Sequence, residues 1–308
     1  MSGVFESLRI IDRAELAERV SMVAAIRAVQ TALRDGFDPE TDLPRSIVDV
    51  RHGQLLLMPA DLGAYAGQKL GMVAPGNPAR GLERIQAIYL VLDAETLAPL
   101  ALLDGTELTS IRTPAVSAAV LDVTATPDAS SLVVFGTGPQ GVRHVEAMRE
   151  IRPIERVRFI GRDAAKAQHA VDLVAGSGLD VAVGTPADVA GADLVVCATS
   201  AREPLFDDAL VADHAALVAL GSHEESAREL PGALLARSQV IVESDRVART
   251  EAGDIILAIA EGHLSASSLV PMGRIVDGSV AAASDRPRIL KTCGMGWQDL
   301  AVAQVAVA

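Results

Sequence analysis

SLVVFGTGPQGVRHVEAMR, residues 131–149, is the stretch that decides the fold. An apolar strand runs into glycines spaced as G-x-G-x-x-G, and a helical pattern over residues 142–149 follows them. Gly136 permits the tight turn, Gly138 lets the backbone approach a pyrophosphate, and Gly141 lets the helix pack closely on the strand. The helix N-terminus then presents free amides and a positive dipole to phosphate. The stretch predicts a dinucleotide-binding βα unit, although a Rossmann-like fold that binds another nucleotide, or none, would carry the same glycines.

Strand-like runs and helical patterns alternate on both sides of this loop. The alternation begins after Thr113-Pro114, where Thr can cap and Pro can take the first position of a helix over residues 115–123. It is the sequence form of repeated βαβ units and predicts an α/β fold, with a parallel sheet in a Rossmann-type domain over residues 114–288. The expected strands are Ser131–Phe135, Val157–Ile160, Asp180–Val183, Leu194–Ala198, Ala216–Leu220 and Val240–Glu243.

Residues 1–113 carry a different pattern. Asp12 begins a capping-box-like start, and apolar residues then recur every three or four positions until Gly36 ends the helix. Five strand-like runs follow with short turns and no helix between them, which predicts a largely antiparallel sheet and an α+β domain. The apolar helix positions are Leu16, Val20, Val23, Ile26, Val29 and Leu33, and the strand-like runs are 46–50, 54–58, 67–73, 87–93 and 97–103.

Composition argues against several functional classes. The formal net charge of −13 repels phosphate backbones and anionic lipid, and no run of Lys or Arg offsets it, so neither nucleic acid nor a membrane is an expected partner. The first residues lack a basic region followed by an apolar core, and no apolar run approaches the roughly 20 residues that cross a bilayer, so we expect a cytoplasmic protein. Cys197 and Cys293 lie in no C-x-x-C and near no spaced His pair, which argues against a metal site or a disulfide framework.

The residues after the second expected strand bear on the choice of cofactor. An NAD site favours an acidic residue about 20 positions on, where this chain has Gly161-Arg162-Asp163. Arg162 is either a solvated side chain or a partner for a 2′-phosphate, and the second reading favours NADP over NAD; an inward-turned Asp163 would favour NAD. The predicted cofactor-binding residues are Gly136, Thr137, Gly138, Pro139, Gln140, Gly141, Arg162, Thr199, Ser200 and Gly221, the last three at the ends of later expected strands.

Three cations in the first domain stand at notable positions. Arg45 comes just before an expected strand, and Arg112 comes immediately before the expected helix. Lys69 lies inside an apolar strand between two glycines, where a charge is costly unless it has a partner. Each of the three is a candidate binding residue, with an ordinary salt bridge as the alternative.

Taken in order along the chain, these features resemble the ornithine cyclodeaminase/mu-crystallin family over nearly the whole sequence. Several ordered motifs are together far more specific than the glycine loop alone. The matching stretches are Met58-Pro59, Lys69 with its flanking glycines, Gly76-Asn77-Pro78 followed by Gly81, Leu108–Thr113, the Gly136–Gly141 loop, Gly221-Ser222 through Arg228-Glu229-Leu230, and Lys291–Asp299.

The resemblance implies a homodimer of two-domain chains, in which residues 1–113 with 289–308 form the substrate-binding and dimerisation domain. By position, Arg45, Lys69 and Arg112 match the residues that bind the substrate carboxylate in this family. The chemistry fits, because two guanidinium groups can bind a carboxylate in bidentate fashion while Lys69 adds a point charge and a transferable proton.

Two positions depart from the ornithine cyclodeaminases. His223 stands where they carry an Asp, and Leu56 stands near the position of a Glu for the distal amine. Both changes remove negative charge suited to ornithine's second amino group, so the resemblance favours the members that act as alanine dehydrogenases and as ketimine or imine reductases. The expected activity is hydride transfer between NADP or NAD and a small α-amino or α-imino acid, with Lys69 or His223 as the proton donor. A lyase that releases ammonia from ornithine with bound NAD is one alternative, and a non-catalytic, mu-crystallin-like protein that binds NADPH and a carboxylate is another.

Overall fold

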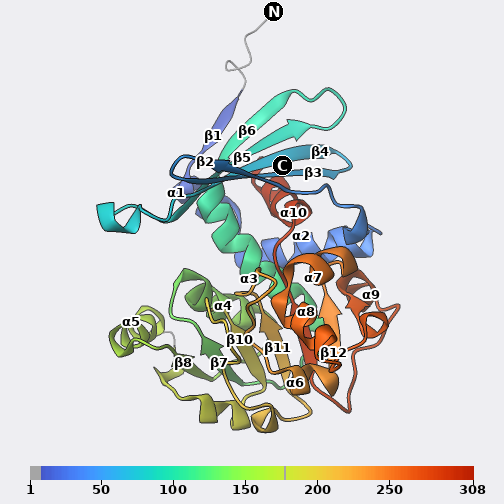
Figure 1. The fold of residues 1–308 in the computed structure, drawn as a ribbon. Helices are drawn as coiled ribbons and strands as arrows, with labels where there is room; N and C mark the ends of the chain where they lie inside the picture. The colour runs from blue at the N-terminus through green and yellow to red at the C-terminus, as the bar shows by residue number, and fades with distance from the viewer. Residues whose placement is uncertain (1–7, 177) are drawn as a thin grey trace, which may run out of the picture. The chain divides into compact units, whose positions relative to one another are not determined.

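The computed structural model describes residues 8–176 and 178–308 and divides into two compact units. The first unit holds the chain up to Ala115 together with Gly294–Ala308, and the second holds Val116–Cys293. Figure 1 shows one sheet in each unit, with helices packed on both sheets. The α/β fold with a Rossmann-type parallel sheet and a second α+β part is therefore confirmed.

The sheet of the first unit has six strands in the order β1-β6-β5-β4-β3-β2. Strands β2 to β6 pair antiparallel in chain order, as predicted, while β1 joins the edge parallel to β6. A longer connection, residues 74–84, joins β4 to β5. Strand β1 was not predicted, because three residues carry no readable alternation. The strands are β1 (Arg9–Ile11), β2 (Ser46–Val50), β3 (Gly53–Leu62), β4 (Tyr65–Val73), β5 (Ile85–Asp93) and β6 (Pro99–Asp104).

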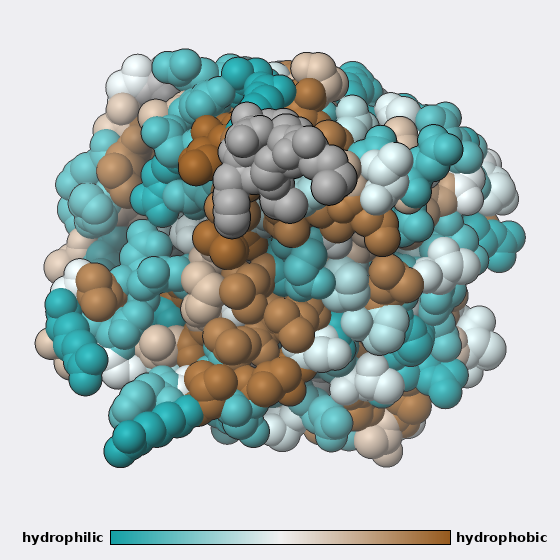
Figure 2. All heavy atoms as spheres, turned by 90° about the horizontal axis from the view of Figure 1, so that it is seen from above, coloured by the Kyte–Doolittle hydropathy of each residue, from teal (hydrophilic) through white to brown (hydrophobic). Residues whose placement is uncertain are grey.

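The two faces of this sheet differ in burial. One row of register partners crosses the inner face and is fully covered: Ile11, Leu103, Tyr89, Lys69 and Met58, none more than 5% exposed. The helix α10 (Gly296–Val307) packs against β3, β4 and α2 (Met22–Arg34) and covers this face. The outer face instead exposes large apolar side chains, among them Ile10, Val48, Leu57 and Ile88. Figure 2 looks onto the outer face and shows a band of hydrophobic residues there.

The long helix predicted from Asp12 is two helices, α1 (Arg13–Arg19) and α2. The break falls at Val20 and Ser21, and the Ser21 hydroxyl accepts a hydrogen bond from the Ala24 amide at the start of α2. Because the break changes the helical phase, Val23 is 43% exposed, and its assignment to the apolar face was wrong. Two 3₁₀ turns, Pro39–Thr41 and Pro78–Arg80, complete the unit.

The helix expected over residues 115–123 begins ten residues earlier, as α3 (Gly105–Thr124). A carboxylate oxygen of Asp104 accepts from the Glu107 amide at 2.8 Å, so Asp104 caps the helix and Pro114 lies inside it. The Thr113-Pro114 start signal was therefore misleading, because the Asp-x-x-Glu pattern at residues 104–107 is the true start. Arg112 consequently lies within the helix rather than before it.

The second unit is built on an eight-stranded parallel sheet in the order β13-β12-β14-β11-β10-β7-β8-β9. The chain order reverses between β7 and β10, and in such sheets ligands bind beyond the carboxyl ends of the strands at this point. The strands are β7 (Ser131–Phe135), β8 (Arg156–Ile160), β9 (Asp180–Val183), β10 (Leu194–Cys197), β11 (Ala216–Ala219), β12 (Gln239–Val242), β13 (Val270–Pro271) and β14 (Arg288–Lys291).

Strand β14 was not predicted, although it is fully buried between β11 and β12. Its sequence, Arg-Ile-Leu-Lys, has a charge at each end and does not read as a core strand. It begins at residue 288, the predicted end of the Rossmann domain, and belongs to the second unit's sheet.

The helices of the second unit cover its sheet, so β7, β10, β11 and β12 are buried throughout. Within the described residues, no helix combines the length and apolar character needed to cross a bilayer. The helices are α4 (Pro139–Ile151), α5 (Ala164–Val174), α6 (Gly232–Ala236), α7 (Asp245–Glu251), α8 (Gly253–Ala260) and α9 (Met272–Val276), with 3₁₀ turns at Pro186–Gly191, Asp208–Leu210 and Ala266–Ser268.

Candidate functional site

The glycine loop after β7 needs two of its glycines for close backbone contacts. A Cβ at Gly136, whose φ is +115°, would lie 2.3 Å from the carbonyl oxygen of Ala198, and one at Gly141 would lie 2.1 Å from that of Gly136. At Gly138, in contrast, a Cβ would meet no atom within 4 Å. Gly138 is the N-cap of α4, and no side chain among the described residues caps that helix. The first turn of α4 therefore has the open space that a bound phosphate requires.

The end of β8 meets this loop through Gly161. A Cβ at Gly161 would lie 2.6 Å from Thr137 Cγ2, so an acidic side chain at this position would displace Thr137. Asp163 does not turn inward, because its carboxylate accepts from two first-turn amides of α5, at 2.9 and 3.1 Å, and caps that helix. Arg162, between them, is exposed.

A buried carboxylate joins the ends of β10 and β11. One oxygen of Glu229 accepts from both the amide and the hydroxyl of Thr199 at 2.7 Å, and the other accepts from the Gly221 amide at 2.7 Å. Burial raises the pKa of Glu229, against the lowering effects of Lys291 and of these hydrogen bonds. The predicted cofactor residues Thr199 and Gly221 are thus held together, with the exposed Ser200 beside them.

A second buried pair, Asp254 and Lys291, binds the backbone of the same loop. One oxygen of Asp254 accepts from the amides of Glu229 and Leu230 at 2.7 and 2.9 Å, and its other oxygen lies 3.3 Å from the Lys291 ammonium. Lys291 also donates to the Ser222 carbonyl at 2.6 Å. Asp254, Glu229 and Lys291 therefore fix the backbone on both sides of His223, which is itself exposed on the loop after β11.

In the first unit, Lys69 and Arg112 share one buried carboxylate. Lys69 Nζ lies 2.7 Å from Asp299 Oδ2, and Arg112 Nε lies 3.3 Å from Asp299 Oδ1. A second Arg112 nitrogen donates to Gln298 Oε1 at 3.2 Å. The three charged side chains come from β4, α3 and α10, and none is more than 8% exposed. Arg45 is close enough for its charge to act on Lys69.

The surroundings of Lys69 place its pKa in a useful range. Burial lowers the pKa most, Asp299 raises it, and Arg112 and Arg45 lower it, which gives a value of about 8. The ammonium can therefore bind an anion at neutral pH and can also give up a proton. Gly294, whose φ is +82°, makes room for this set, because a Cβ there would lie 2.7 Å from Arg112.

Tyr89 lies beside Lys69 on the neighbouring strand. It is the register partner of Lys69 on β5, and its buried hydroxyl has no hydrogen-bond partner among the described residues. A Cβ at Gly67 would lie 2.2 Å from that hydroxyl, so the glycine leaves room for the ring. Burial, followed by the charges of Asp299 and Asp42, raises the pKa of Tyr89 well above its usual value, so the side chain stays a neutral phenol.

Sequence reasoning assigned no role to Asp299, Glu229, Asp254 or Lys291. One signal existed, since Asp299 is the acidic residue in the first turn of a largely apolar helix. Their partners, however, lie far away in sequence: 230 residues separate Lys69 from Asp299. Within the described residues, no group of three or more His, Cys, Asp or Glu side chains is arranged to hold a metal ion.

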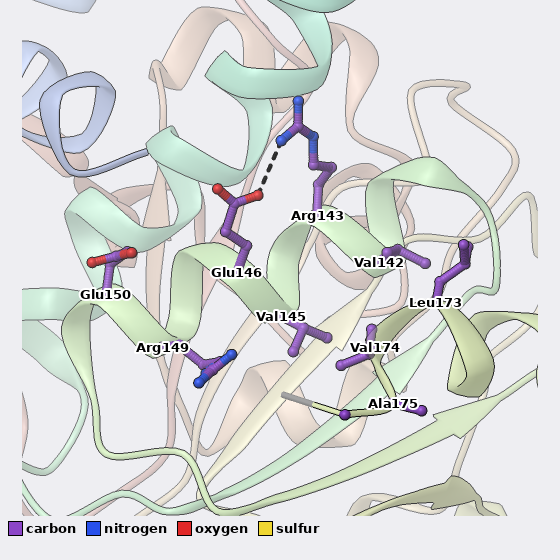
Figure 3. Close-up of a pocket in the computed structure, with 10 residues that line it drawn as sticks. Val142, Arg143, Val145, Glu146, Arg149, Glu150, Leu173, Val174 and Ala175 are labelled. Carbon is purple, nitrogen blue, oxygen red and sulfur yellow. Dashed lines mark hydrogen bonds and ion pairs between the residues drawn. The ribbon is translucent and has the colours of Figure 1, made fainter. Parts of the chain in front are cut away.

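A surface hollow of about 640 Å³ lies elsewhere in the second unit, between α4 and the end of α5 (Figure 3). Arg143 and Glu146 form an ion pair at 3.0 Å on its α4 side. None of its lining residues is a predicted site residue. They are Val142, Arg143, Val145, Glu146, Arg149, Glu150, Leu173, Val174, Ala175 and Gly176.

Comparisons with known proteins agree over nearly the whole chain. Residues 8–307 match the sequence model of the ornithine cyclodeaminase/mu-crystallin family. A Δ1-pyrroline-2-carboxylate reductase 1 of Burkholderia multivorans is 30% identical over 310 residues, which cover 96% of this chain and 94% of that protein.

Two solved structures share the fold closely. The Δ1-pyrroline-2-carboxylate reductase of Thermococcus litoralis, in complex with NADH and L-proline, has a TM-score of 0.90 and 26% identity, with 97% of this chain and 96% of that chain covered. An archaeal alanine dehydrogenase dimer with bound NAD has the same TM-score and identity, with 97% and 95% covered.

Proposed function

This chain belongs to the ornithine cyclodeaminase/mu-crystallin family, and we propose that it catalyses hydride transfer between a nicotinamide cofactor and a small α-amino or α-imino acid. The observation that carries the proposal is the buried group of Lys69 and Arg112 around Asp299, within reach of the charge of Arg45. Cations held so rigidly beneath a sheet suit the binding of one small carboxylate.

The dinucleotide binds at the glycine loop of the second unit. The open N-terminus of α4 at Gly138 accepts the pyrophosphate, and the loops held together by Glu229, at Thr199 and Gly221, contribute backbone and hydroxyl groups. Thr137, Pro139, Gln140 and Ser200 complete the predicted contacts. When bound, the nicotinamide supplies or accepts the hydride.

We assign a preference for NADP to Arg162. NAD-binding sites favour an acidic residue at the position that Gly161 occupies here. Arg162 follows it and is exposed, and the Asp163 carboxylate is engaged in capping α5. A guanidinium matches a 2′-phosphate in geometry and charge. An Arg162→Ala variant is expected to lose affinity for NADPH while keeping its affinity for NADH, and equal losses for both cofactors would contradict the assignment.

The substrate carboxylate binds to Arg45, Lys69 and Arg112. Reduction of an imine then adds a hydride to the α-carbon and a proton to the nitrogen. Lys69 is the proton donor we favour, because its pKa of about 8 makes it an ammonium at neutral pH that can release its proton readily. His223 is the second candidate, since an imidazole also transfers protons near neutral pH.

The outer sheet face of the first unit supports a homodimer. Ile10, Val48, Leu57 and Ile88 lie on that face with between 36% and 71% of their surface exposed, and large exposed apolar groups of this kind mark protein interfaces. A second copy of the chain offers a matching apolar face (Figure 2), and the related alanine dehydrogenase is described as a dimer. We propose that two copies pair through these faces.

The experiment that tests the function follows the absorbance of the reduced nicotinamide with pyruvate plus ammonium and with cyclic ketimine acids. Ammonia release from ornithine, without added reductant, is measured in parallel. Consumption of NAD(P)H with an imino acid supports the proposal. Ammonia release without net use of cofactor would assign a cyclodeaminase instead, and tight cofactor binding with no turnover of any amino or imino acid would assign a binding protein.

A further inference from the structure

Asp299 lies at the centre of the cation group and is not among the residues that we propose to bind the substrate. It lies in the first turn of α10 and is fully buried. Its two oxygens are divided, one to Lys69 on β4 and one to Arg112 on α3. A buried carboxylate is costly unless charged partners of this kind satisfy it, so the three side chains hold one another in place.

The arrangement leaves other donors of both cations for a ligand. An ammonium has three N–H donors and a guanidinium has five. Lys69 gives one to Asp299, and Arg112 gives one to Asp299 and one to Gln298 among the described residues. Because these bonds fix the side-chain torsions, the remaining N–H groups keep fixed directions.

We propose that Asp299 is the positioning residue of the carboxylate-binding group: it orients Lys69 and Arg112 with its two oxygens and keeps Lys69 in the ammonium form that the substrate needs. The inference rests on the proposed function and extends it to a residue that acts through Lys69 and Arg112.

The charges around Lys69 explain why Asp299 matters for its protonation. Arg112 from α3 and Arg45 from the segment before β2 both disfavour a second positive charge, and burial disfavours it further. Tyr89 from β5 is a neutral phenol and offers no compensation. Asp299 from α10 is the group that favours the ammonium, so its neutralisation should leave Lys69 largely deprotonated at neutral pH.

The test compares Asp299→Asn with Asp299→Glu in the full-length protein. Asp299→Asn keeps the shape and removes the charge, so kcat/KM for a cyclic ketimine acid should fall at least about tenfold, as expected for a lost charge-assisted hydrogen bond. For the unaltered enzyme we expect an alkaline fall in activity near pH 8, from the pKa of Lys69, and in Asp299→Asn this fall should move to lower pH. Asp299→Glu keeps the charge, so the alkaline limb should stay in place. Its longer side chain cannot orient Lys69 and Arg112 in the same way, so KM should rise.

Glu107→Gln is the matched control. Glu107 is a buried carboxylate on α3 of the same unit, and Arg13 Nε lies 4.0 Å from one of its oxygens. It should change neither KM nor the pH profile. NADH affinity should be unchanged in all three variants, which distinguishes a local effect from general unfolding.

Two results would overturn the inference. One is a folded Asp299→Asn variant with unaltered KM and an unaltered alkaline limb. The other is an alkaline limb displaced equally by Asn and Glu, which would show that side-chain shape rather than charge matters. If Asp299→Asn does not fold, the Glu variant still decides, because the inference requires a raised KM with an unmoved limb.

A binding measurement separates this inference from the proposed function. Pyrrole-2-carboxylate is a planar acid that cannot be reduced as an imine, and calorimetry reports its affinity for the NADH-loaded protein. If the unaltered protein turns over no amino or imino acid, the proposed function fails, but tenfold or so weaker binding of this acid to Asp299→Asn would still support the role of Asp299. Equal binding by both proteins, or binding by neither, would refute that role.

Discussion

The amide of Gly221 and the carboxylate of Glu229 are joined by a 2.7 Å hydrogen bond that links the end of β11 to the chain eight residues later. The other Glu229 oxygen accepts hydrogen bonds from the amide and the hydroxyl of Thr199, which follows β10. A single buried side chain therefore aligns two of the loops that we assign to the cofactor.

Replacing Glu229 by Gln should disturb this alignment. The carboxamide has one acceptor oxygen, so its NH₂ group must face an N–H donor at Gly221 or at Thr199. We expect a loss of about 1–3 kcal/mol in the free energy of unfolding, with weaker NADH binding. Denaturant titration and cofactor fluorescence measure the two effects. Glu261→Gln, which weakens the ion pairs of an exposed carboxylate with Arg228 and His263, is the control and should leave both values near those of the parent.

Gly138 should separate cofactor binding from folding. A Cβ at Gly138 meets no protein atom within 4 Å, so Gly138→Ala should fold normally, yet the methyl group would stand where the pyrophosphate approaches the start of α4. We expect NADH affinity to fall by about tenfold or more, the effect of a misplaced phosphate contact. Gly191→Ala, equally unobstructed but in another turn, should bind NADH as the parent does. Equal NADH affinities of the two variants would show that the pyrophosphate does not bind at the start of α4.

His144 should make the protein sensitive to mild acid. Its Nδ1–H donates to the Gln140 carbonyl at 2.7 Å, and its Nε2 accepts from the Ser117 hydroxyl at 2.9 Å, so the buried ring is neutral. Burial, opposed by the bond to Gln140, lowers its pKa from 6.5 to about 4.

Between these two values the unfolded chain binds the proton and the folded chain does not, so stability falls as the pH drops from 6.5 towards 4. The full effect is on the order of 3 kcal/mol. Urea titrations of the parent and of His144→Gln, at neutral pH and near pH 5, measure it. The parent should lose more stability than the variant, and parallel losses would mean that His144 is not the sensitive group.

The outer sheet face should hold two copies together. Ile88→Glu places a charge among the exposed apolar residues of that face, so we expect a monomer in sedimentation where the parent is a dimer. Leu173→Glu is the control, because Leu173 is 60% exposed but lies beside the hollow of the second unit (Figure 3). If Ile88→Glu remained a dimer and Leu173→Glu were a monomer, the dimer interface would lie at that hollow instead.

Local patterns in the sequence predicted the parts of the fold that local interactions determine. The β7 strand, the glycine loop and α4 follow one another directly, so periodicity and glycine spacing were enough to place them. The start of α3 was misjudged because Thr113-Pro114 is also a sound helix-start signal, while the Asp104 cap is decided by its bond to Glu107.

Contacts between distant segments could not be predicted in the same way. Strand β14 is a strand because β11 and β12 pair with it on both sides, not because its four residues favour that state. Asp299 meets Lys69 only after α10 packs against β4. The family resemblance placed the three cations in one group, but only the folded chain identifies the carboxylate that two of them share.

The proposed hydride transfer can be followed by the fate of one hydrogen atom. Δ1-Pyrroline-2-carboxylate is incubated with the protein and with NADPH or NADH that carries deuterium at the transferable C4 position, and the product is examined by mass spectrometry. We expect proline with a single deuterium at its α-carbon, formed by the parent and lost with Arg112→Ala. Absence of labelled proline from the cofactor-loaded parent, or equal labelling by Arg112→Ala, would contradict this expectation.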